Sequence, residues 1–180
     1  MTVDARHGLR DLPHLARRFF WSLRAPAPDH DTEAWLVALL NEAEAELYRA
    51  QPQVDRSHSV SCAVAARDGL GTRASDQLVV ASAMHDVGKA RAQLGTIGRV
   101  IATVVSAVVP APTMASWAAR PQGWRARFGW YAHHDRYGAE LLAEAGSAAE
   151  VVAWAAEHHR PESEWSLDPA IGRVLAAADA

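Results

Sequence analysis

The stretch DQLVVASAMHDVGKA, residues 76–90, is almost continuously apolar until it reaches His85 and Asp86. A run of this kind is typical of the central helix of a helical bundle, because such a helix has no face toward solvent. Gly88 favours a helix end just after the pair, where an irregular turn allows two consecutive side chains to point inward. Imidazole nitrogen and carboxylate oxygen are both ligands of divalent metals. The pair is therefore a candidate metal-binding element at the end of a buried helix.

The rest of the chain also favours helices. Apolar residues recur at spacings of three and four, and no segment alternates with a period of two for long enough to indicate a sheet. Ser147 and Glu150 match a capping box, which begins a helix. We expect an all-α fold whose helices cover, approximately, residues 11–24, 31–51, 55–71, 76–88, 95–109, 133–146, 147–160 and 168–179.

Length, charge and cysteine content narrow the class of protein. The chain has 180 residues, of which 49% are hydrophobic, enough for one compact domain with a substantial core. A net charge of −3 and a pI near 6.3 give no general attraction to nucleic acid, although Arg120, Arg125 and Arg127 form a local basic stretch. Cys62 is the only cysteine, which excludes an intrachain disulfide and a cysteine-rich zinc site. This composition, rich in alanine, suits the reducing cytoplasm of a bacterium.

The sequence predicts neither an export signal nor a membrane span. Residues 1–23 have no uninterrupted apolar core of signal-peptide length and no small-residue cleavage site. The most apolar window has ten residues without a charge, Val100 to Val109, whereas about 20 are needed to cross a bilayer. We interpret this window as a buried helix.

Nine histidines are present, and a histidine on an apolar helix is usually a hydrogen-bonded core or surface residue. His7, His14 and His30 lie in the polar N-terminal third and are expected to be of that ordinary kind. Five others stand with two aspartates near helix ends or on faces with apolar neighbours. The combined set, which we expect to converge on one or two metal ions, is His58, His85, Asp86, His134, His158, His159 and Asp179.

Four of these residues resemble, in their order, the pattern of the HD-domain superfamily of metal-dependent phosphohydrolases. That pattern has a histidine, a His-Asp pair and a distant aspartate on separate helices of an all-α bundle. Here His58 in DRSHS corresponds to the first histidine, and HDVGK supplies the pair His85 and Asp86. Asp179 in VLAAADA corresponds to the closing aspartate.

The remaining three histidines resemble an addition found in dinuclear branches of that superfamily, a histidine before a Gly-Ala dipeptide and more at the end of the next helix. HDRYGAELL offers His134, and EHHRP offers His158 and His159. The resemblance implies that these three hold or border a second metal and share Asp86 with the first four. It implies one or two divalent ions, with Mn, Fe, Zn, Mg, Ni and Co as candidates, and metal-activated water as the nucleophile.

Basic residues near the ligand set are candidates for contact with phosphate. By the same resemblance, Asp86 is catalytic, and so is Lys89, which lies one turn away and would neutralise phosphate charge in the transition state. Arg136 and Arg160 flank proposed ligands and are candidate substrate-binding residues, with Arg99 a further candidate, because guanidinium binds phosphate in a bidentate manner. The alternative for each is an ordinary solvated side chain.

The resemblance covers residues 54–180, so residues 1–53 are expected to form accessory helices packed on this domain. Asp179 is the penultimate residue, and its role as a ligand depends on firm docking of the last helix. Residues 117–131 interleave tryptophans and arginines, which could stack on a base, lie against a membrane or a partner, or plug the bundle. We expect the plug. The oligomeric state stays open.

The expected function is that of a metal-dependent phosphohydrolase acting on a nucleotide or another small phosphoester. HDVGKARAQ lacks the acidic residues of the alarmone-hydrolysing branch, and HHRPESEW lacks the Gly-Tyr-Pro motif of the cyclic-dinucleotide branch. A compact dinuclear branch of similar length hydrolyses symmetric dinucleoside tetraphosphates. Two alternatives remain, a di-iron oxygenase of the same superfamily and a non-catalytic binding module stabilised by metal.

Overall fold

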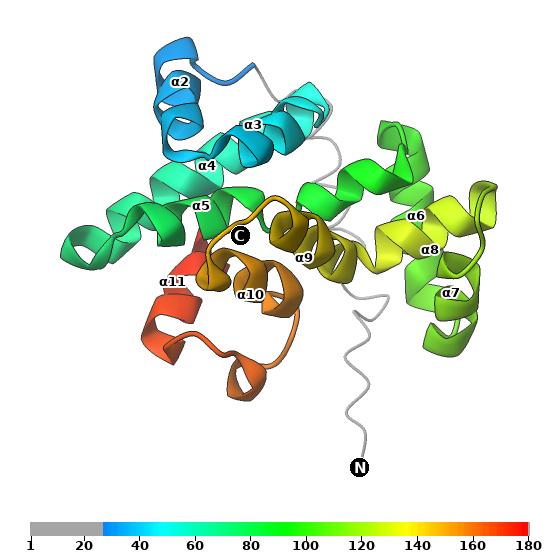
Figure 1. The fold of residues 1–180 in the computed structure, drawn as a ribbon. Coiled ribbons are helices and arrows are strands. Elements are labelled where there is room, and N and C mark those ends of the chain that lie inside the picture. The colour runs from blue at the N-terminus through cyan, green and yellow to red at the C-terminus, as the bar shows by residue number, and fades with distance from the viewer. Residues whose placement is uncertain (1–26, 180) are drawn as a thin grey trace.

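The computed structural model describes residues 27–179. The helix predicted over residues 11–24 falls outside this range. Within the range the chain forms α-helices and short 3₁₀ segments and no strand, which confirms the predicted all-α fold (Figure 1). The α-helices are α2 (His30–Leu39), α3 (Glu42–Arg49), α4 (Gln53–Leu70), α5 (Asp76–Met84), α6 (Thr96–Val108), α7 (Ala111–Ala118), α8 (Trp124–Ala132), α9 (His134–Glu144), α10 (Ala149–Glu157) and α11 (Pro169–Ala178). The 3₁₀ segments are η2 (Gly71–Arg73), η3 (Val87–Ala92) and η4 (Glu162–Glu164).

Helix α5 is the centre of the bundle. Every side chain from Leu78 to Met84 is buried, as the continuously apolar sequence predicts. Helices α4 and α10 pack against α5, α11 packs against α4, and α9 packs against α10. Leu36 of α2 and Tyr48 of α3 are buried in the same core. Because α5 ends inside the bundle, the two residues that follow it are buried as well.

The helix predicted from Asp31 to about residue 51 is in fact two helices. Leu40 is extended, and Asn41 caps α3. The Asn41 side chain accepts a hydrogen bond from the Glu44 backbone, and the Glu44 carboxylate accepts one from the Asn41 backbone. This capping box satisfies N–H groups at the start of a new helix, so it stabilises a break within a continuous apolar stripe.

The capping box predicted at Ser147 is not formed. Gly146 has φ 71°, and the Ser147 N–H bonds back to the Leu142 carbonyl, so Ser147 closes α9 instead of opening α10. Helix α10 begins one residue later, with Ala148 as its N-cap and no side-chain cap. The buried Ser147 hydroxyl finds no partner among the described residues.

Helices α6, α7 and α8 form a lobe beside the bundle, at the right of Figure 1, and we call it the lateral lobe. Helix α8 packs against α6, α7 and η3. The lobe is thereby attached to the segment that directly follows Asp86. Its small core, separate from that of the bundle, contains Ala92, Leu94 and Ala102, with Phe128, Trp130 and Tyr131 packed on it.

Nine of the ten residues in the window Val100 to Val109 lie in α6, Val109 is its C-cap, and the prediction of a buried helix is wrong. Ile101, Val104 and Val108 are exposed, and the main neighbour of α6 among the described elements is α8. None of the described helices is both long and apolar enough to span a bilayer.

The tryptophans of residues 117–131 do not plug the bundle, contrary to expectation. The rings of Trp117 and Trp124 pack edge to face on each other, and Trp130 donates its Nε1–H to the Ala118 carbonyl. These contacts lie within the lateral lobe, because α7 packs mainly on α8, and α8 packs on α7, α6 and η3.

Candidate metal centre

The first ligand group gathers side chains from three helices. His58 lies in α4, His85 is the C-cap of α5, and Asp179 is the C-cap of α11. Asp86 follows His85 with φ −96° and ψ 3°, a bridge-region conformation that buries both side chains of the pair. Nε2 of His58 lies 3.0 Å from Oδ1 of Asp179 and 3.8 Å from Oδ2 of Asp86. The four ligand atoms all lie within 4.8 Å of one another.

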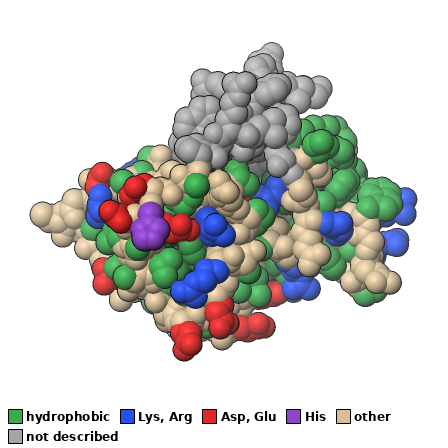
Figure 2. Space-filling model, turned by 90° about the horizontal axis from the view of Figure 1, so that it is seen from above, with side chains coloured by type: hydrophobic (Ala, Val, Ile, Leu, Met, Phe, Trp, Pro, Cys, Tyr) green, Lys and Arg blue, Asp and Glu red, His purple; other side chains and the backbone are tan. Residues whose placement is uncertain are grey.

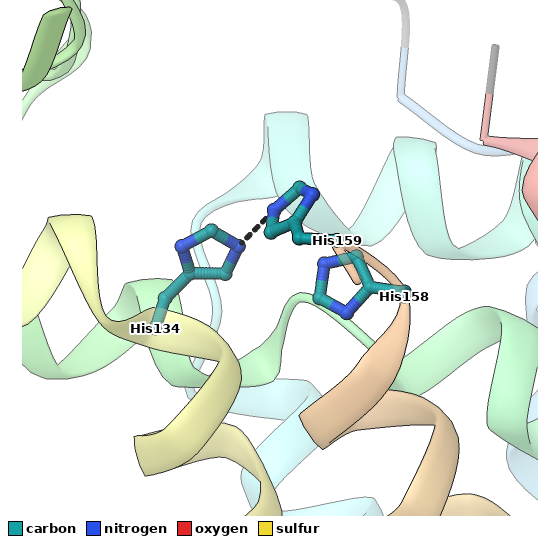
Figure 3. Close-up of side chains that lie close together, drawn as sticks. All are labelled: His134, His158 and His159. Atoms are coloured by element: carbon teal, nitrogen blue, oxygen red, sulfur yellow. Dashed lines mark hydrogen bonds between the residues drawn. The ribbon is translucent and has the colours of Figure 1, made fainter. Parts of the chain in front are cut away.

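The second ligand group consists of three histidines, drawn in Figure 3. His134 is the first residue of α9, His158 is the C-cap of α10, and His159 follows it. Nε2 of His134 lies 3.2 Å from Nε2 of His159, and the three ligand atoms lie within 4.8 Å of one another. Imidazole nitrogens gathered so closely suit zinc, iron or nickel, which take such ligands readily.

Asp86 lies between the two groups. Its Oδ2 is 3.5 Å from Nε2 of His85 and 3.8 Å from Nε2 of His58, in the first group. Its Oδ1 is 3.0 Å from Nε2 of His134 and 3.8 Å from Nε2 of His158, in the second. One carboxylate therefore presents one oxygen to each group.

Three of the histidines are oriented in the same way. Nδ1 of His85, His134 and His158 donates to the backbone carbonyl three residues earlier, at 2.7, 2.8 and 3.0 Å. Because a carbonyl only accepts, Nδ1 carries a proton, and the atom that can offer a lone pair to the site in the neutral tautomer is therefore Nε2. The carbonyls belong to the last turns of α5, α8 and α10, where backbone oxygens lack a partner within the helix.

Some of these electron pairs are buried without a partner. Within the described chain, Nε2 of His85, Nε2 of His158 and Oδ1 of Asp86 have no hydrogen bond. A buried polar atom left in this state costs about 1–3 kcal/mol. A divalent cation accepts electron pairs from nitrogen and carboxylate oxygen, so the donor set fits metal ions.

Comparison with known families agrees with this geometry. The family model of the HD domain matches residues 56–180, well over half of the chain. The chain belongs to the HD-domain family. HD domains are generally metal-dependent hydrolases, and the two ligand groups here could hold metal ions of unknown identity. No curated protein and no solved structure matched the chain.

In this HD domain the two carboxylates are kept ionised. Burial alone would raise the pKa of Asp86, but the positive charge of Lys89 outweighs it and holds that pKa well below its usual range. Burial also opposes ionisation of Asp179, but the hydrogen bond with His58 lowers the pKa of Asp179 below its ordinary value. Both carboxylates therefore carry the negative charge that attracts a cation.

The pKa of His58 in the first group is raised, whereas the pKa values of His158 and His159 in the second are lowered. Burial by itself lowers the pKa of His58, but hydrogen bonds with Asp179 and Cys62 outweigh it and raise that pKa to about 10. Desolvation by surrounding side chains, reinforced by neighbouring imidazoles, lowers the pKa of His158 to about 2, and it lowers that of His159, which is more exposed to solvent, to about 4. His158 and His159 are therefore neutral and ready to donate lone pairs, whereas His58 must lose a proton to bind a metal.

Lys89 is a cation in direct contact with Asp86. It lies in η3, and its Nζ contacts Oδ2 of Asp86, the oxygen that faces the first group. Burial opposes the charge of the amine, but the charge of Asp86 outweighs it and raises the pKa of Lys89. A charged, half-buried ammonium beside the ligand set is what the predicted contact with phosphate requires.

Two glycines bring the turn after Asp86 against α9. A Cβ at Gly88 would lie 2.0 Å from the His134 carbonyl oxygen and 2.5 Å from the Gly138 backbone nitrogen. From the sequence, Gly88 is predicted only to end a helix, and its part in placing Asp86 beside His134 was missed. A signal was present, because Gly138 lies one turn after His134 and so on the same face of α9.

Asp179 is positioned by a helix that is held at both ends. Asp168 caps the N-terminus of α11 and accepts hydrogen bonds from the backbone N–H groups of Ala170 and Ile171. Helix α11 packs against α4, and Leu175 is buried in the bundle core. Helix α11 is therefore docked firmly on the bundle, as a ligand role for Asp179 requires.

The candidate arginines lie apart from the ligand groups. Arg136 pairs with Glu140 on the exposed side of α9, and Arg160 is exposed just beyond α10. Arg99 forms a two-pronged ion pair with Asp55 in the first turn of α4. In the described chain none of these guanidinium groups contacts a proposed ligand. Substrate contact by the arginines, like metal ligation by the seven residues of the two groups, stays a prediction.

Proposed function

We propose that this HD domain is a metal-dependent phosphohydrolase that acts on a nucleotide or another small phosphoester. The observation that carries the proposal is the position of Asp86, whose two carboxylate oxygens face the two ligand groups. A pair of cations sharing one carboxylate suits phosphoryl transfer, because the attacking and leaving oxygens both carry negative charge in the transition state. The seven donors match this requirement in type and in number.

The contacts within the two ligand groups support the ligand assignment. When bound, divalent ions polarise phosphoryl oxygens and lower the pKa of water. The protein itself orients the donors, since backbone carbonyls fix three imidazole rings and the turn at Asp86 fixes the shared carboxylate. One ion would be held by His58, His85, Asp86 and Asp179, and a second by His134, His158 and His159 with Asp86 shared.

Lys89 is the residue that we assign to the phosphate of the substrate. Its ammonium is charged, lies beside Asp86, and can donate to a phosphate oxygen placed over the ligand groups. His159 is exposed and His58 is half-buried, so a small substrate can approach the centre from the surface. We expect loss of this charged donor to lower turnover by about tenfold to a thousandfold.

Metal analysis paired with a phosphate-release screen tests the proposal. The chain is purified without chelator, its metal content is measured, and the apoprotein is reloaded separately with Mn²⁺, Fe²⁺, Zn²⁺, Mg²⁺, Ni²⁺ or Co²⁺. Each form is assayed with nucleoside phosphates, dinucleoside tetraphosphates and simple phosphomonoesters and diesters. We expect metal-dependent phosphate release that His85→Ala abolishes. The control variant His30→Ala, at an exposed histidine, should keep both metal and turnover.

Two results would contradict the proposal. Full metal occupancy without turnover of any phosphoester would make the domain a metal-stabilised binding module. Oxygen uptake by the iron-loaded form with polyols or phosphonates, without phosphate release from phosphoesters, would make it a di-iron oxygenase.

A further inference from the structure

Helix α6 turns small and polar side chains toward the protein and large aliphatic ones away from it. Ala102 is fully buried in the core of the lateral lobe, and Arg99 pairs with Asp55 of α4. On the opposite side, Ile97 is 71% exposed and Val108 is 66% exposed. A surface helix normally buries its aliphatic stripe and exposes its polar face. The inverted orientation marks the stripe as a contact surface.

The exposed aliphatic residues form one continuous stripe. Ile97, Ile101, Val104 and Val108 are spaced by four, three and four residues, so at 100° per residue they fall within about 60° of the helix circumference. Ile101 and Val104 in its middle are 48% and 45% exposed. The stripe is roughly 17 Å long at 1.5 Å per residue, which is too short to cross a bilayer but long enough to lie along a surface.

The sequence segment that contains this stripe has basic residues but no acidic ones, although Lys89 pairs with Asp86 and Arg99 pairs with Asp55 of α4. Between Asp86 and Asp135 there is no acidic residue, whereas the same segment has Lys89 and five arginines. The whole chain has a net charge of −3, so the lateral lobe is a basic region of an acidic protein. Figure 2 shows hydrophobic and basic side chains together over the lobe, at the right of the view, while most acidic ones lie elsewhere on that face.

An aromatic and cationic group completes the exposed surface of the lobe. Trp124 is 55% exposed, and the Arg125 guanidinium lies 4.6 Å from its ring centroid. Arg120 and Arg91 are exposed as well. Exposed tryptophan and arginine, together with an aliphatic helix face, are typical of segments that lie in the interface of an anionic bilayer.

We propose that the lateral lobe is a docking surface for an anionic phospholipid membrane, with the stripe of α6 entering the headgroup region and the arginines contacting lipid phosphates. A second copy fits less well, because two lobes joined through α6 would bring like charges together. Residues 1–26 fit less well too, since they carry five arginines against two aspartates. An anionic bilayer satisfies the aliphatic stripe and the basic charge at once. Because α8 packs on η3, docking would hold the metal centre close to the membrane.

Vesicle co-sedimentation of the full chain tests this surface. Vesicles are made of phosphatidylcholine alone or of phosphatidylcholine mixed with phosphatidylglycerol, and binding is measured at low and high salt. We expect binding to the mixed vesicles only, weakened by salt because the lipid charge is screened. Each basic side chain near the surface contributes about a fivefold change in partitioning. Arg120→Glu with Arg125→Glu should therefore weaken binding by at least about tenfold, and Ile97→Gln with Val108→Gln should also weaken it strongly.

A matched control separates the lobe from net charge. Arg49→Glu with Arg73→Glu makes the same change in charge at exposed arginines outside the lobe and should bind within about twofold of the wild type. Circular dichroism confirms that every variant is folded. The proposal is overturned if the wild type does not bind the mixed vesicles, or if the lobe variants and the control variant bind them equally well. It is also overturned if light scattering shows a dimer that Ile97→Gln with Val108→Gln dissociates, or if the arginines are needed for binding double-stranded DNA while the stripe is not.

Discussion

The two ligand groups differ in charge and in how the chain assembles them. The first contains both carboxylates and joins segments far apart, since His58 and Asp179 are separated by 121 residues. The second contains three imidazoles from the adjacent helices α9 and α10, and its only negative charge is the shared Oδ1 of Asp86. The difference indicates that the first group attracts a cation through charge, whereas the second depends on lone pairs and on correct placement of Asp86.

This contrast predicts unequal affinity and unequal sensitivity. The second group should release its metal first when a chelator is added, because a site with less negative charge binds a divalent cation less tightly. The second group should also lose its metal when η3 and α9 move apart, because Asp86 and His134 lie on opposite sides of the contact between them. Substitutions at Asp86, at Gly88 in the η3–α9 contact, and at Lys89 should therefore have different effects on the two groups.

Asp86→Asn should have the largest effect, because it removes the negative charge from both groups at once. The amide keeps the shape of the carboxylate but binds a cation weakly, and it leaves the half-buried Lys89 without its anionic partner. We expect loss of both metal ions, a fall in turnover of at least about a thousandfold, and a lower melting temperature. Metal analysis, the phosphate-release assay and thermal unfolding measure the three effects.

The control for this variant is Asp68→Asn, at an exposed aspartate that pairs with Arg67. It should change none of these quantities by more than the error of measurement, because exposed ion pairs contribute little to stability. Retention of two ions by Asp86→Asn would contradict the assignment of Asp86 as a shared ligand.

Gly88→Ala should have the next largest effect, because it damages one group and spares the other. The added methyl group would collide with the backbone of His134 and Gly138, so η3 and α9 must separate. We expect a destabilisation of about 1–3 kcal/mol, typical of overpacking, and loss of the ion in the second group only. Denaturant unfolding and metal analysis measure both. Gly95→Ala is the matched control, because a Cβ at Gly95 meets nothing within 4 Å. Equal behaviour of the two variants would show that the close approach does not matter.

Lys89→Ala should have the smallest effect on the metals and a clear effect on rate. Removal of the ammonium frees Oδ2 of Asp86, so the first group should keep its ion or bind it more tightly. Turnover should fall by about tenfold to a thousandfold while metal content stays at the wild-type level. Steady-state kinetics on the metal-loaded variant measure this. Wild-type turnover in Lys89→Ala would show that Lys89 does not contact the phosphate. Loss of metal in this variant would show that Lys89 is a structural partner of Asp86.

The composition of the two groups could be predicted from the sequence because it depends on residue type and on position near helix ends. The continuously apolar stretch before His85 indicates a buried helix, and its end places the next two side chains in the core. The separate histidines and the last aspartate were predicted from resemblance to a known pattern. The structure brings all of them together in the two predicted groups.

What could not be predicted depends on relations between helices. The approach of Gly88 to α9 requires two backbones to be in contact, and a glycine near a helix end is explained equally well as a stop signal. The hydrogen bonds that orient His85 and His134 come from backbone carbonyls, which carry no sequence signal. The orientation of α6 was predicted wrongly. An apolar helix face favours contact with another apolar surface, but the sequence does not show whether another element of the same chain covers it.

The number of metal ions per chain in the wild type and in His134→Ala tests the central claim most directly. His134 belongs to the second group alone, so its removal should leave the four residues of the first group intact. Both proteins are loaded with the same metal, freed of excess ion, and measured together by elemental analysis. The shared-carboxylate arrangement predicts about two ions in the wild type and about one in His134→Ala, with a larger loss of turnover than of stability. One ion in both proteins would contradict it and leave a mononuclear centre with His134, His158 and His159 in a purely structural role.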